Sequence, residues 1–269
     1  NKFLKILEKG ENKMIALVTG ASSGIGRDIA IELAKRKYDI IAVARNEKAL
    51  NDLKSDVEKE YNINVDVSPM DLVDRDGCVQ LHKEVKEKYG CVDVLVNDAG
   101  FGACGDFTET DLDKELGMID TNIVALHILT KLFLKDMVEE NKGHIMNVAS
   151  IAGFMPGPLM ATYYSTKAYV VRLTQSIRQE LFMKHSKVKI CALCPGPVNT
   201  NFNKVADVKF NLVEANSKQV ARCAVRKMFA NKILIFPSLT MWLGRLLFKI
   251  MPDQLSAFFC YFAQKRKII

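Results

Sequence analysis

The sequence predicts an α/β fold: a single domain built on a doubly wound parallel sheet of about seven strands, with helices on both faces. Three observations support this. Short apolar runs alternate with longer amphipathic runs from residue 14 to residue 236, the apolar runs are nearly continuous, and no repeat or low-complexity linker divides the chain. Continuous apolar strands are typical of a sheet that is buried on both faces. The 269 residues, 49% of them apolar, are enough for one large core.

The predicted elements follow one another in strict β-α order. Apolar residues in the predicted helices recur at intervals of three and four, as on one face of an α-helix. Parallel strands joined by right-handed helical crossovers form a Rossmann fold, which binds ligands at the carboxyl ends of its strands. The predicted strands are 14–19, 39–44, 64–68, 92–96, 144–149, 188–193 and 233–236, and the predicted helices are 25–36, 46–60, 74–89, 111–139, 162–184 and 217–229.

The charge pattern excludes one large class of partner. The net charge is +7, but no stripe of basic residues interleaved with aromatic residues occurs before the C-terminus. The sequence therefore predicts no nucleic-acid partner, and the basic balance is consistent with an anionic small molecule. Residues 1–13 are expected to be an N-terminal extension. They lack the continuous apolar stretch of a signal peptide, which predicts a cytoplasmic protein.

The cysteines predict neither a disulfide framework nor a metal site. Their number, seven, is odd, and most of them lie inside periodic segments. Cys191 and Cys194 form a CxxC pair, but they fall in the predicted strand 188–193 and directly after it, and residues three apart in a strand face opposite sides. Since no second ligand pair accompanies them, we expect structural cysteines and no bound metal.

A glycine-rich turn follows the first predicted strand. Residues 19–26 read Thr-Gly-Ala-Ser-Ser-Gly-Ile-Gly, with glycines at positions 20, 24 and 26, and the next predicted helix begins there. Glycine allows a tight turn and lets backbone N–H groups approach a pyrophosphate at the N-terminus of a helix. The strand, turn and helix in this order predict a dinucleotide site.

A tyrosine and a lysine lie four residues apart in the predicted helix 162–184. Tyr163 and Lys167 share one helix face, because residues i and i+4 are neighbours at about 3.6 residues per turn. A nearby cation favours a phenolate, so Lys167 is expected to lower the pKa of Tyr163 from its usual value of about 10. Ser150 ends the preceding strand, where its hydroxyl could donate to a substrate carbonyl oxygen. Tyr164 lies three residues from Lys167, also within its reach, and is therefore the alternative to Tyr163 as the residue that exchanges a proton with the substrate.

Together these motifs resemble the short-chain dehydrogenase/reductase family. The glycine spacing is G-x-x-x-G-x-G, the family's Tyr-x-x-x-Lys spacing selects Tyr163, and the resemblance covers about residues 14–236. It implies an oxidoreductase in which Tyr163 exchanges a proton with the substrate oxygen, Ser150 stabilises that oxygen and Lys167 binds the nicotinamide ribose. It also implies that Asn122 holds a water on the proton path. The expected catalytic residues are Asn122, Ser150, Tyr163 and Lys167.

The expected cofactor is NADP(H) in preference to NAD(H). The second strand is followed by Arg45 rather than by an acid for the adenosine ribose, and a guanidinium can pair with a 2′-phosphate. The resemblance implies that residues 71–72 contact the adenine and that residues 195–200 contact the nicotinamide. Residues 97–100 resemble the family's Asn-Asn-Ala-Gly segment, with Asp98 as the second residue. The expected cofactor-binding residues are Gly20, Ser22, Ser23, Gly24, Ile25, Gly26, Arg45, Asp71, Leu72, Asn97, Ala99, Gly100, Tyr163, Lys167, Pro195, Gly196, Val198 and Thr200.

The loops expected to line the substrate pocket are apolar. They are 101–107, 154–160 and the position of Phe202 after the Pro-Gly turn. Pockets with such a lining bind hydrophobic molecules, so the expected substrate is a small lipophilic carbonyl or alcohol, such as a steroid-like ketone or a 3-oxoacyl chain.

Residues 237–269 form an apolar and basic C-terminal extension to the Rossmann-fold domain of residues 14–236. Arg245 and Lys249 interrupt its apolar stretch and Pro252 breaks it, short of the ~20 residues that span a bilayer. Three uses stay open: an oligomer face, a lid over the pocket, or an interfacial anchor whose basic end meets anionic headgroups. We therefore expect a homo-oligomer, a dimer or a tetramer, and retain peripheral membrane contact through 239–267 as an alternative.

Three classes of function are compatible with these motifs. The first is an NADP(H)-dependent oxidoreductase that interconverts a carbonyl and a secondary alcohol. The second is a non-catalytic NADP(H)-sensing regulatory protein, which would need only the cofactor residues. The third is an isomerase, epimerase or dehydratase acting on a nucleotide sugar, for which this chain leaves little room. Retention of Ser150, Tyr163 and Lys167 favours the first.

Overall fold

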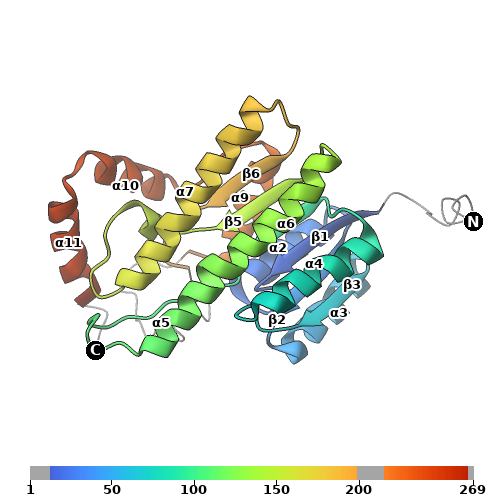
Figure 1. The fold of residues 1–269 in the computed structure, drawn as a ribbon, viewed down its shortest axis with the longest axis horizontal. Helices are drawn as coiled ribbons and strands as arrows, with labels where there is room; N and C mark the ends of the chain where they lie inside the picture. Colours follow the sequence, from blue (N-terminus) through green and yellow to red (C-terminus); the bar gives the residue numbers. More distant parts are fainter. Residues whose placement is uncertain (1–12, 199–214, 266–269) are drawn as a thin grey trace, which may run out of the picture.

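A computed structural model of the chain describes residues 13–198 and 215–265. Within them, seven parallel strands form one sheet in the order β3-β2-β1-β4-β5-β6-β7 (Figure 1). This confirms the predicted fold class and strand number. The strand order changes direction between β1 and β4, which opens a crevice at the carboxyl ends of these strands. The strands are β1 Met14–Thr19, β2 Tyr38–Ala44, β3 Val65–Pro69, β4 Val94–Asn97, β5 His144–Val148, β6 Lys189–Leu193 and β7 Leu234–Ile235.

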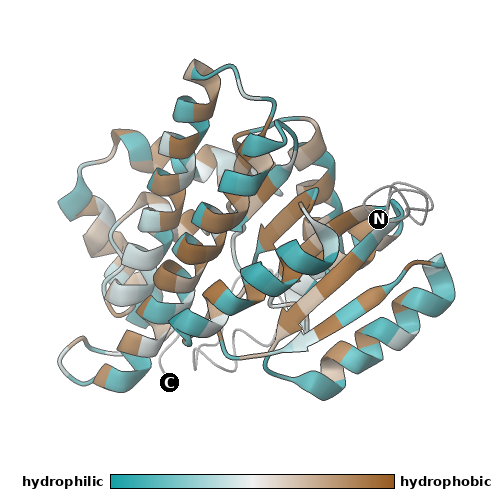
Figure 2. Ribbon diagram, turned by 45° about the vertical axis from the view of Figure 1, so that its right-hand side comes forward, coloured by the Kyte–Doolittle hydropathy of each residue, from teal (hydrophilic) through white to brown (hydrophobic). Residues whose placement is uncertain are grey.

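Helices cover both faces of the sheet, so the molecule has three layers (Figures 1 and 2). Helices α2, α3 and α9 pack on one face, and α4, α6 and α7 on the other. The described helices are α2 Gly24–Ala34, α3 Glu47–Tyr61, α4 Arg75–Tyr89, α5 Leu112–Ile119, α6 Leu126–Glu139, α7 Ala161–Met183, α9 Ser217–Phe229, α10 Leu239–Ile250 and α11 Asp253–Lys265, with a π-helical turn η1 Asp120–Ala125 and a 3₁₀ turn η2 Ile151–Phe154.

The first strand shows why the apolar runs are continuous. Ala16 and Val18 pack on the α2 and α9 side, whereas Ile15 and Leu17 pack on the α4 and α6 side. All four side chains are buried, because successive residues of a strand face opposite sides and here both sides are covered. Full burial of one such large aliphatic side chain contributes about 2 kcal/mol. The central strands therefore supply much of the core.

Side-chain caps begin most of the helices that lead away from the sheet. Asn46 accepts a hydrogen bond from the N–H of Ala49 at the start of α3, and Asp74 and Asp111 do the same for α4 and α5. Helix α2 differs. Ser23 precedes it without a side-chain cap, and its first turn contains no acidic residue. The positive end of α2 thus faces the carboxyl edge of the sheet without a cap from Ser23 and without an acid in its own first turn.

The predicted helix 111–139 is interrupted in its middle. Helix α5 passes through the π-turn η1 into α6, and Asn122 lies in η1 with its side chain buried. The whole stretch is long and apolar enough to span a bilayer. However, Leu129, Phe133 and Met137 are buried against the sheet, as in the core helix of a globular domain. Single π-turns inside α-helices often mark functional sites.

A buried hydrogen-bond network joins two strands and two helices below the crevice. Asn147 on β5 accepts from the amide of Asn97 on β4 at 2.9 Å and donates to the hydroxyl of Thr174 on α7 at 3.0 Å. Thr130 on α6 bonds to both asparagines. Among the described residues, the Oδ1 atom of Asn97 is the buried side-chain oxygen without a hydrogen-bond partner. Asn97 therefore joins β4 to β5 and α6, and it does not line the crevice.

The CxxC pair has the structural role that the sequence predicts. Cys191 lies within β6 and Cys194 follows it, both buried with free thiols. Burial raises the pKa of Cys191 to about 12. A thiol that stays protonated is a poor metal ligand and nucleophile.

Candidate active site

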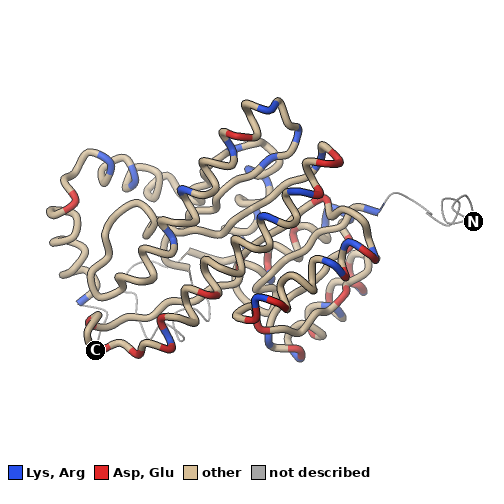
Figure 3. Tube along the Cα trace, in the orientation of Figure 1, with Lys and Arg blue, Asp and Glu red and all other residues tan. Residues whose placement is uncertain are grey.

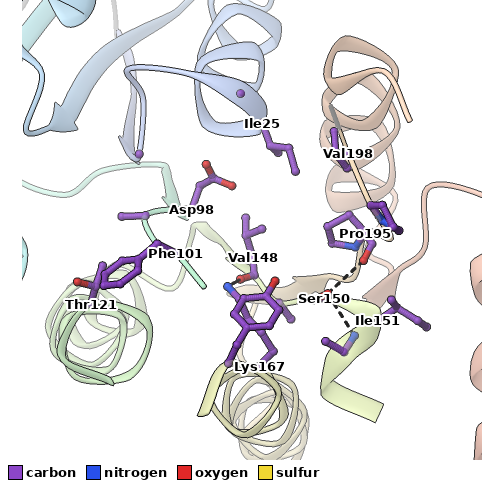
Figure 4. A pocket seen from close by; sticks show the side chains of 18 of the residues that line it. Ile25, Asp98, Phe101, Thr121, Val148, Ser150, Ile151, Lys167, Pro195 and Val198 are labelled. Atoms are coloured by element: carbon purple, nitrogen blue, oxygen red, sulfur yellow. Dashed lines mark hydrogen bonds between the residues drawn. The ribbon is translucent and has the colours of Figure 1, made fainter. Parts of the chain in front are cut away.

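The crevice is a pocket of about 550 Å³ that extends from the glycine turn to the C-terminal helices. Its walls come from the carboxyl ends of β1, β4, β5 and β6 and from the first turns of α2 and α7. Figure 4 shows Asp98 and Phe101 on the left of the pocket, Val198 and Ser150 on the right, Ile25 at the top and Lys167 at the bottom. The predicted cofactor and catalytic segments thus meet in one cavity at the topological switch point.

The glycine turn is packed so closely that side chains would not fit. Gly20 has a φ of +70° and Gly24 a φ of +59°, in the left-handed region. A Cβ atom on Gly26 would lie 2.6 Å from both the carbonyl oxygen of Gly20 and the Oδ2 atom of Asp98. Gly26 supports the turn from behind, whereas Gly20 and Gly24 line the pocket. With the uncapped start of α2, this backbone fits a phosphate group.

Ser150 lies where β5 ends, at the edge of the pocket. Its hydroxyl donates to the carbonyl oxygen of Pro195 at 3.4 Å and accepts from the N–H of Ala152 at 3.2 Å (Figure 4). It also forms a hydrogen bond with the phenol of Tyr163. The 3₁₀ turn η2 begins directly after Ser150, so the local backbone holds its hydroxyl toward α7.

Lys167 lies one helical turn after Tyr163, as the spacing predicts. Its Nζ atom is 5.8 Å from the centroid of the Tyr163 ring and donates to the carbonyl oxygen of Val148 at 2.9 Å. Burial lowers the pKa of Lys167 to about 8, while the charge of Asp98 opposes this shift. The buried amine is therefore held by a backbone carbonyl, and the charge of Asp98 favours its protonated form.

The expected acidification of Tyr163 is wrong for this structure. Burial is the main cause that raises the pKa of Tyr163 to about 12; the hydrogen bond with Ser150 opposes this shift, and the charge of Asp98 adds to it. The physical reason is desolvation: a phenolate in this enclosed site loses more hydration than one neutral donor returns. The phenol is thus protonated near neutral pH.

Asn122 fastens a loop rather than lining the pocket. Its Oδ1 atom accepts from the N–H of Phe101 at 3.1 Å, and its amide donates to the carbonyl oxygen of Phe101 at 2.9 Å and to the hydroxyl of Thr166 at 3.1 Å. A Cβ atom on Gly100 would lie 2.7 Å from the same Oδ1 atom. Asn122 therefore joins the loop after β4 to α7, and its role on a proton path stays a prediction.

Arg45 and Asp71 lie together at the outer end of the pocket. Both line it, and the Nη1 atom of Arg45 is 3.6 Å from the Oδ2 atom of Asp71. The two side chains are largely exposed, so this ion pair contributes little to stability. No acid ends β2, in agreement with the sequence, and the guanidinium stays accessible to an anionic group.

Asp98 is the ionisable group that distinguishes this site from the expected Asn-Asn-Ala-Gly pattern. It lies partly exposed in the pocket wall, and its carboxyl accepts a hydrogen bond from the backbone of Gly26. Burial raises the pKa of Asp98 to about 7, although the charge of Lys167 and that hydrogen bond both lower it. A group that changes charge near neutral pH thus lies between the glycine turn and Lys167.

Most of the predicted site residues line this one pocket, and three of the described ones do not: Gly26, Asn97 and Asn122. Thr200 lies outside the described residues. The residues that line it are Gly20, Ser22, Ser23, Gly24, Ile25, Arg45, Asp71, Leu72, Ala99, Gly100, Ser150, Tyr163, Lys167, Pro195, Gly196 and Val198.

The apolar loops contribute only in part. Phe101, Met155 and Met160 line the pocket, whereas Phe107 is 66% exposed and Phe154 packs against the ring of Phe236. Phe202 lies outside the described residues. The sequence also did not identify the lining residues of the C-terminal extension, which are Thr240, Met241, Gly244 and Phe248 of α10 and Gln264 of α11. The spacing of the four residues in α10, at intervals close to one helical turn, was the available signal.

Both the sequence and the fold of this chain match known proteins. Residues 14–209 match the family described as short chain dehydrogenase. An uncharacterized oxidoreductase of Staphylococcus saprophyticus is 34% identical over 186 residues, which cover 69% of this chain and 79% of that protein. A short-chain dehydrogenase from Sphingobium yanoikuyae in complex with NADPH is 26% identical, with a TM-score of 0.79, over 89% of this chain and 97% of that one. A short chain dehydrogenase/reductase from Burkholderia phymatum in complex with NAD, 22% identical, shares the fold with a TM-score of 0.80 over 87% of this chain and 92% of that one.

Proposed function

The chain belongs to the short-chain dehydrogenase family of oxidoreductases, and from this premise we propose that it interconverts a carbonyl and a secondary alcohol on a lipophilic substrate, with NADP(H) as cofactor. One observation carries the proposal. Ser150, Tyr163 and Lys167 converge at one end of a pocket whose other end is the glycine turn at the start of α2. A hydride carrier and a proton donor are the two requirements of carbonyl reduction.

The residues present fit a dinucleotide. The close backbone approach at Gly20 and Gly26 leaves room for a pyrophosphate but not for side chains, and the start of α2 presents N–H groups to it. Arg45 is accessible at the expected position of the adenosine ribose. The bound nicotinamide ring would supply or accept a hydride. Its ribose would lie within reach of Tyr163 and Lys167.

Side chains of the protein donate the proton and stabilise the substrate oxygen. Tyr163 is protonated near neutral pH because burial raises its pKa to about 12, and a neutral phenol is the form that can donate to a developing alkoxide. The hydroxyl of Ser150, already hydrogen-bonded to that phenol, stabilises the same oxygen. Lys167 places its ammonium beside the ring and is positioned by the carbonyl of Val148. In this state Tyr163 can act as the acid in carbonyl reduction.

The lining of the pocket supports a lipophilic substrate. Beyond Ser150 and Tyr163, the wall is formed by Phe101, Met155 and Met160 together with Met241 and Phe248 of the C-terminal helix α10. Methionine side chains are unbranched and adapt to ligands of different shape. A steroid-like ketone or a 3-oxoacyl chain has the required apolar surface and a single reactive carbonyl.

Replacement of two neighbouring tyrosines tests the catalytic assignment. Tyr163→Phe removes the proton donor and should lower kcat by about 10²- to 10⁴-fold on a panel of lipophilic ketones, while NADPH binding measured by fluorescence is retained. Tyr164→Phe is the matched control and should keep most of the turnover. Normal turnover of Tyr163→Phe together with loss of turnover in Tyr164→Phe would show that Tyr164, and not Tyr163, is the proton donor.

The cofactor preference has its own test. Arg45→Glu places an acid where the guanidinium stood, which should weaken NADPH binding by about 10- to 100-fold and leave NADH binding unchanged or improved. Titration of both cofactors against both variants measures this. If NADH already binds the wild type as tightly as NADPH, the preference for NADP(H) is refuted while the reaction class stands.

The rival function is a nucleotide-sensing regulator with the same fold. Such a protein would bind NADPH but show no oxidation of it, at 340 nm absorbance, with any carbonyl in the panel. The retained Ser150, Tyr163 and Lys167 favour an enzyme, because a sensor needs only the cofactor-binding residues.

A further inference from the structure

The two C-terminal helices expose an unusual number of large apolar side chains. No side chain of α10 is buried, Ile250 is 80% exposed and Phe258 is 57% exposed. We call the outer surface of the pair the C-terminal apolar face. Exposed apolar side chains gathered on neighbouring helices in this number are typical of an interaction site. Its members are Leu239, Trp242, Leu243, Leu246, Leu247 and Ile250 of α10 and Leu255, Phe258, Phe259, Tyr261 and Phe262 of α11.

The opposite side of the same helices is held against the pocket. Arg245 lies over the rings of Phe154 and Phe236, at 5.4 and 5.8 Å from their centroids. The amide of Gln264 donates to the phenol oxygen of Tyr164, which joins α11 to α7. The helix pair is therefore both a wall of the pocket and the carrier of the apolar face. It lies beyond α7 at one end of the molecule (Figure 1).

The charges beside this face are mainly positive. Residues 239–265 contain Arg245, Lys249 and Lys265 but one acid, Asp253, and Figure 3 shows few charged positions on the two helices. Basic residues beside exposed Trp, Phe and Leu side chains are typical of helices that lie in the interface of an anionic membrane.

We propose that the C-terminal apolar face binds the surface of an anionic lipid bilayer. Helix α10 has 12 residues, too short to span a membrane, so it lies in the plane of the interface with its outer side chains among the acyl chains. The exposed side chain of Lys249 is then close to lipid headgroups. Bilayer binding itself does not depend on the proposed function. The proposed function adds one consequence: a lipophilic substrate reaches the pocket from the membrane leaflet.

The single tryptophan of the chain makes this measurable. Trp242 is 42% exposed on the proposed face, so its fluorescence should shift to the blue when the full-length protein is mixed with vesicles of phosphatidylcholine and phosphatidylglycerol in equal parts. The protein should sediment with these vesicles, bind pure phosphatidylcholine more weakly, and lose affinity at high salt. Tyr163→Phe should bind equally well, which separates this test from the test of catalysis.

A double variant and a matched control complete the experiment. Ile250→Ser with Phe258→Ser removes two exposed side chains of the face and should weaken vesicle binding at least about tenfold without lowering Tm. Phe182→Ser removes an equally exposed side chain, 69% accessible, near the end of α7 and should bind like the wild type. Absence of binding at about 1 mM lipid would refute the proposal. So would an oligomer, seen by light scattering, that the double variant dissociates while vesicles bind neither form.

Discussion

Replacing Asp98 by Asn should stabilise the protein in a pH-dependent way. The carboxyl of Asp98 has an ordinary pKa of 3.8, and burial raises this pKa to about 7 in the folded protein. Between these two values the folded protein keeps a proton that the unfolded chain has released, so stability falls as pH rises through this window. The difference between a pKa of 3.8 and one of about 7 corresponds to about 4 kcal/mol at most. Because the side chain is partly exposed to the pocket, solvent reduces this to about 2 kcal/mol.

Asn resembles the protonated acid in shape and charge, so Asp98→Asn removes this penalty. Urea unfolding at two pH values measures the effect: the gain should be below about 1 kcal/mol at pH 5 and about 2 kcal/mol at pH 8, with Tm raised by about 4 °C at the higher pH. Asp106→Asn is the control. The backbone and hydroxyl of Thr108 lower the pKa of Asp106, so this variant should gain nothing at pH 8. A gain for Asp98→Asn that is the same at both pH values, or a loss at pH 8, would contradict the reasoning.

Two further predictions follow from the packing below and beside the site. Asn147→Ala removes a side chain that bonds to Asn97, Thr130 and Thr174, so it should cost about 3 kcal/mol in urea unfolding, and a double-mutant cycle with Thr174→Val should reveal coupling of about 1 kcal/mol; strict additivity would contradict the network. Gly26→Ala places a methyl group 2.6 Å from the carbonyl oxygen of Gly20, so it should weaken NADPH binding, measured by fluorescence titration, at least about tenfold. Binding at wild-type affinity would mean that this turn does not hold the pyrophosphate.

The sequence predicted the parallel sheet and its seven strands because the relevant signals are local. Each strand is a short apolar run whose two faces are both buried, as Ile15 and Ala16 on β1 illustrate. The predicted limits of β1 are those observed, and most other limits are within two residues. Helix 111–139 was predicted without its π-turn, because the turn depends on the contacts of Asn122 with Phe101 and Thr166, which are distant in sequence.

The positions of the site residues were predictable, but their electrostatics were not. Spacing alone places Tyr163 and Lys167 on one face of α7, and the parallel strands place Ser150 at the same edge of the sheet as the glycine turn. The pKa of Tyr163 depends instead on how deeply the folded chain encloses the phenol and on the neighbouring Asp98. Such burial is the sum of many contacts, so the expectation of an acidic phenol was reversed.

By itself, the sequence determined the fold class, the dinucleotide turn and the order of the catalytic side chains, because these follow from intervals of a few residues along one strand or helix. Only the tertiary structure decided where the C-terminal extension packs. Gln264 contacts Tyr164 across 100 residues, which gives α11 an inner face on the pocket and leaves Phe258 exposed on the outer face. Contacts between such distant segments depend on the packing of the whole chain, and no local interval records them.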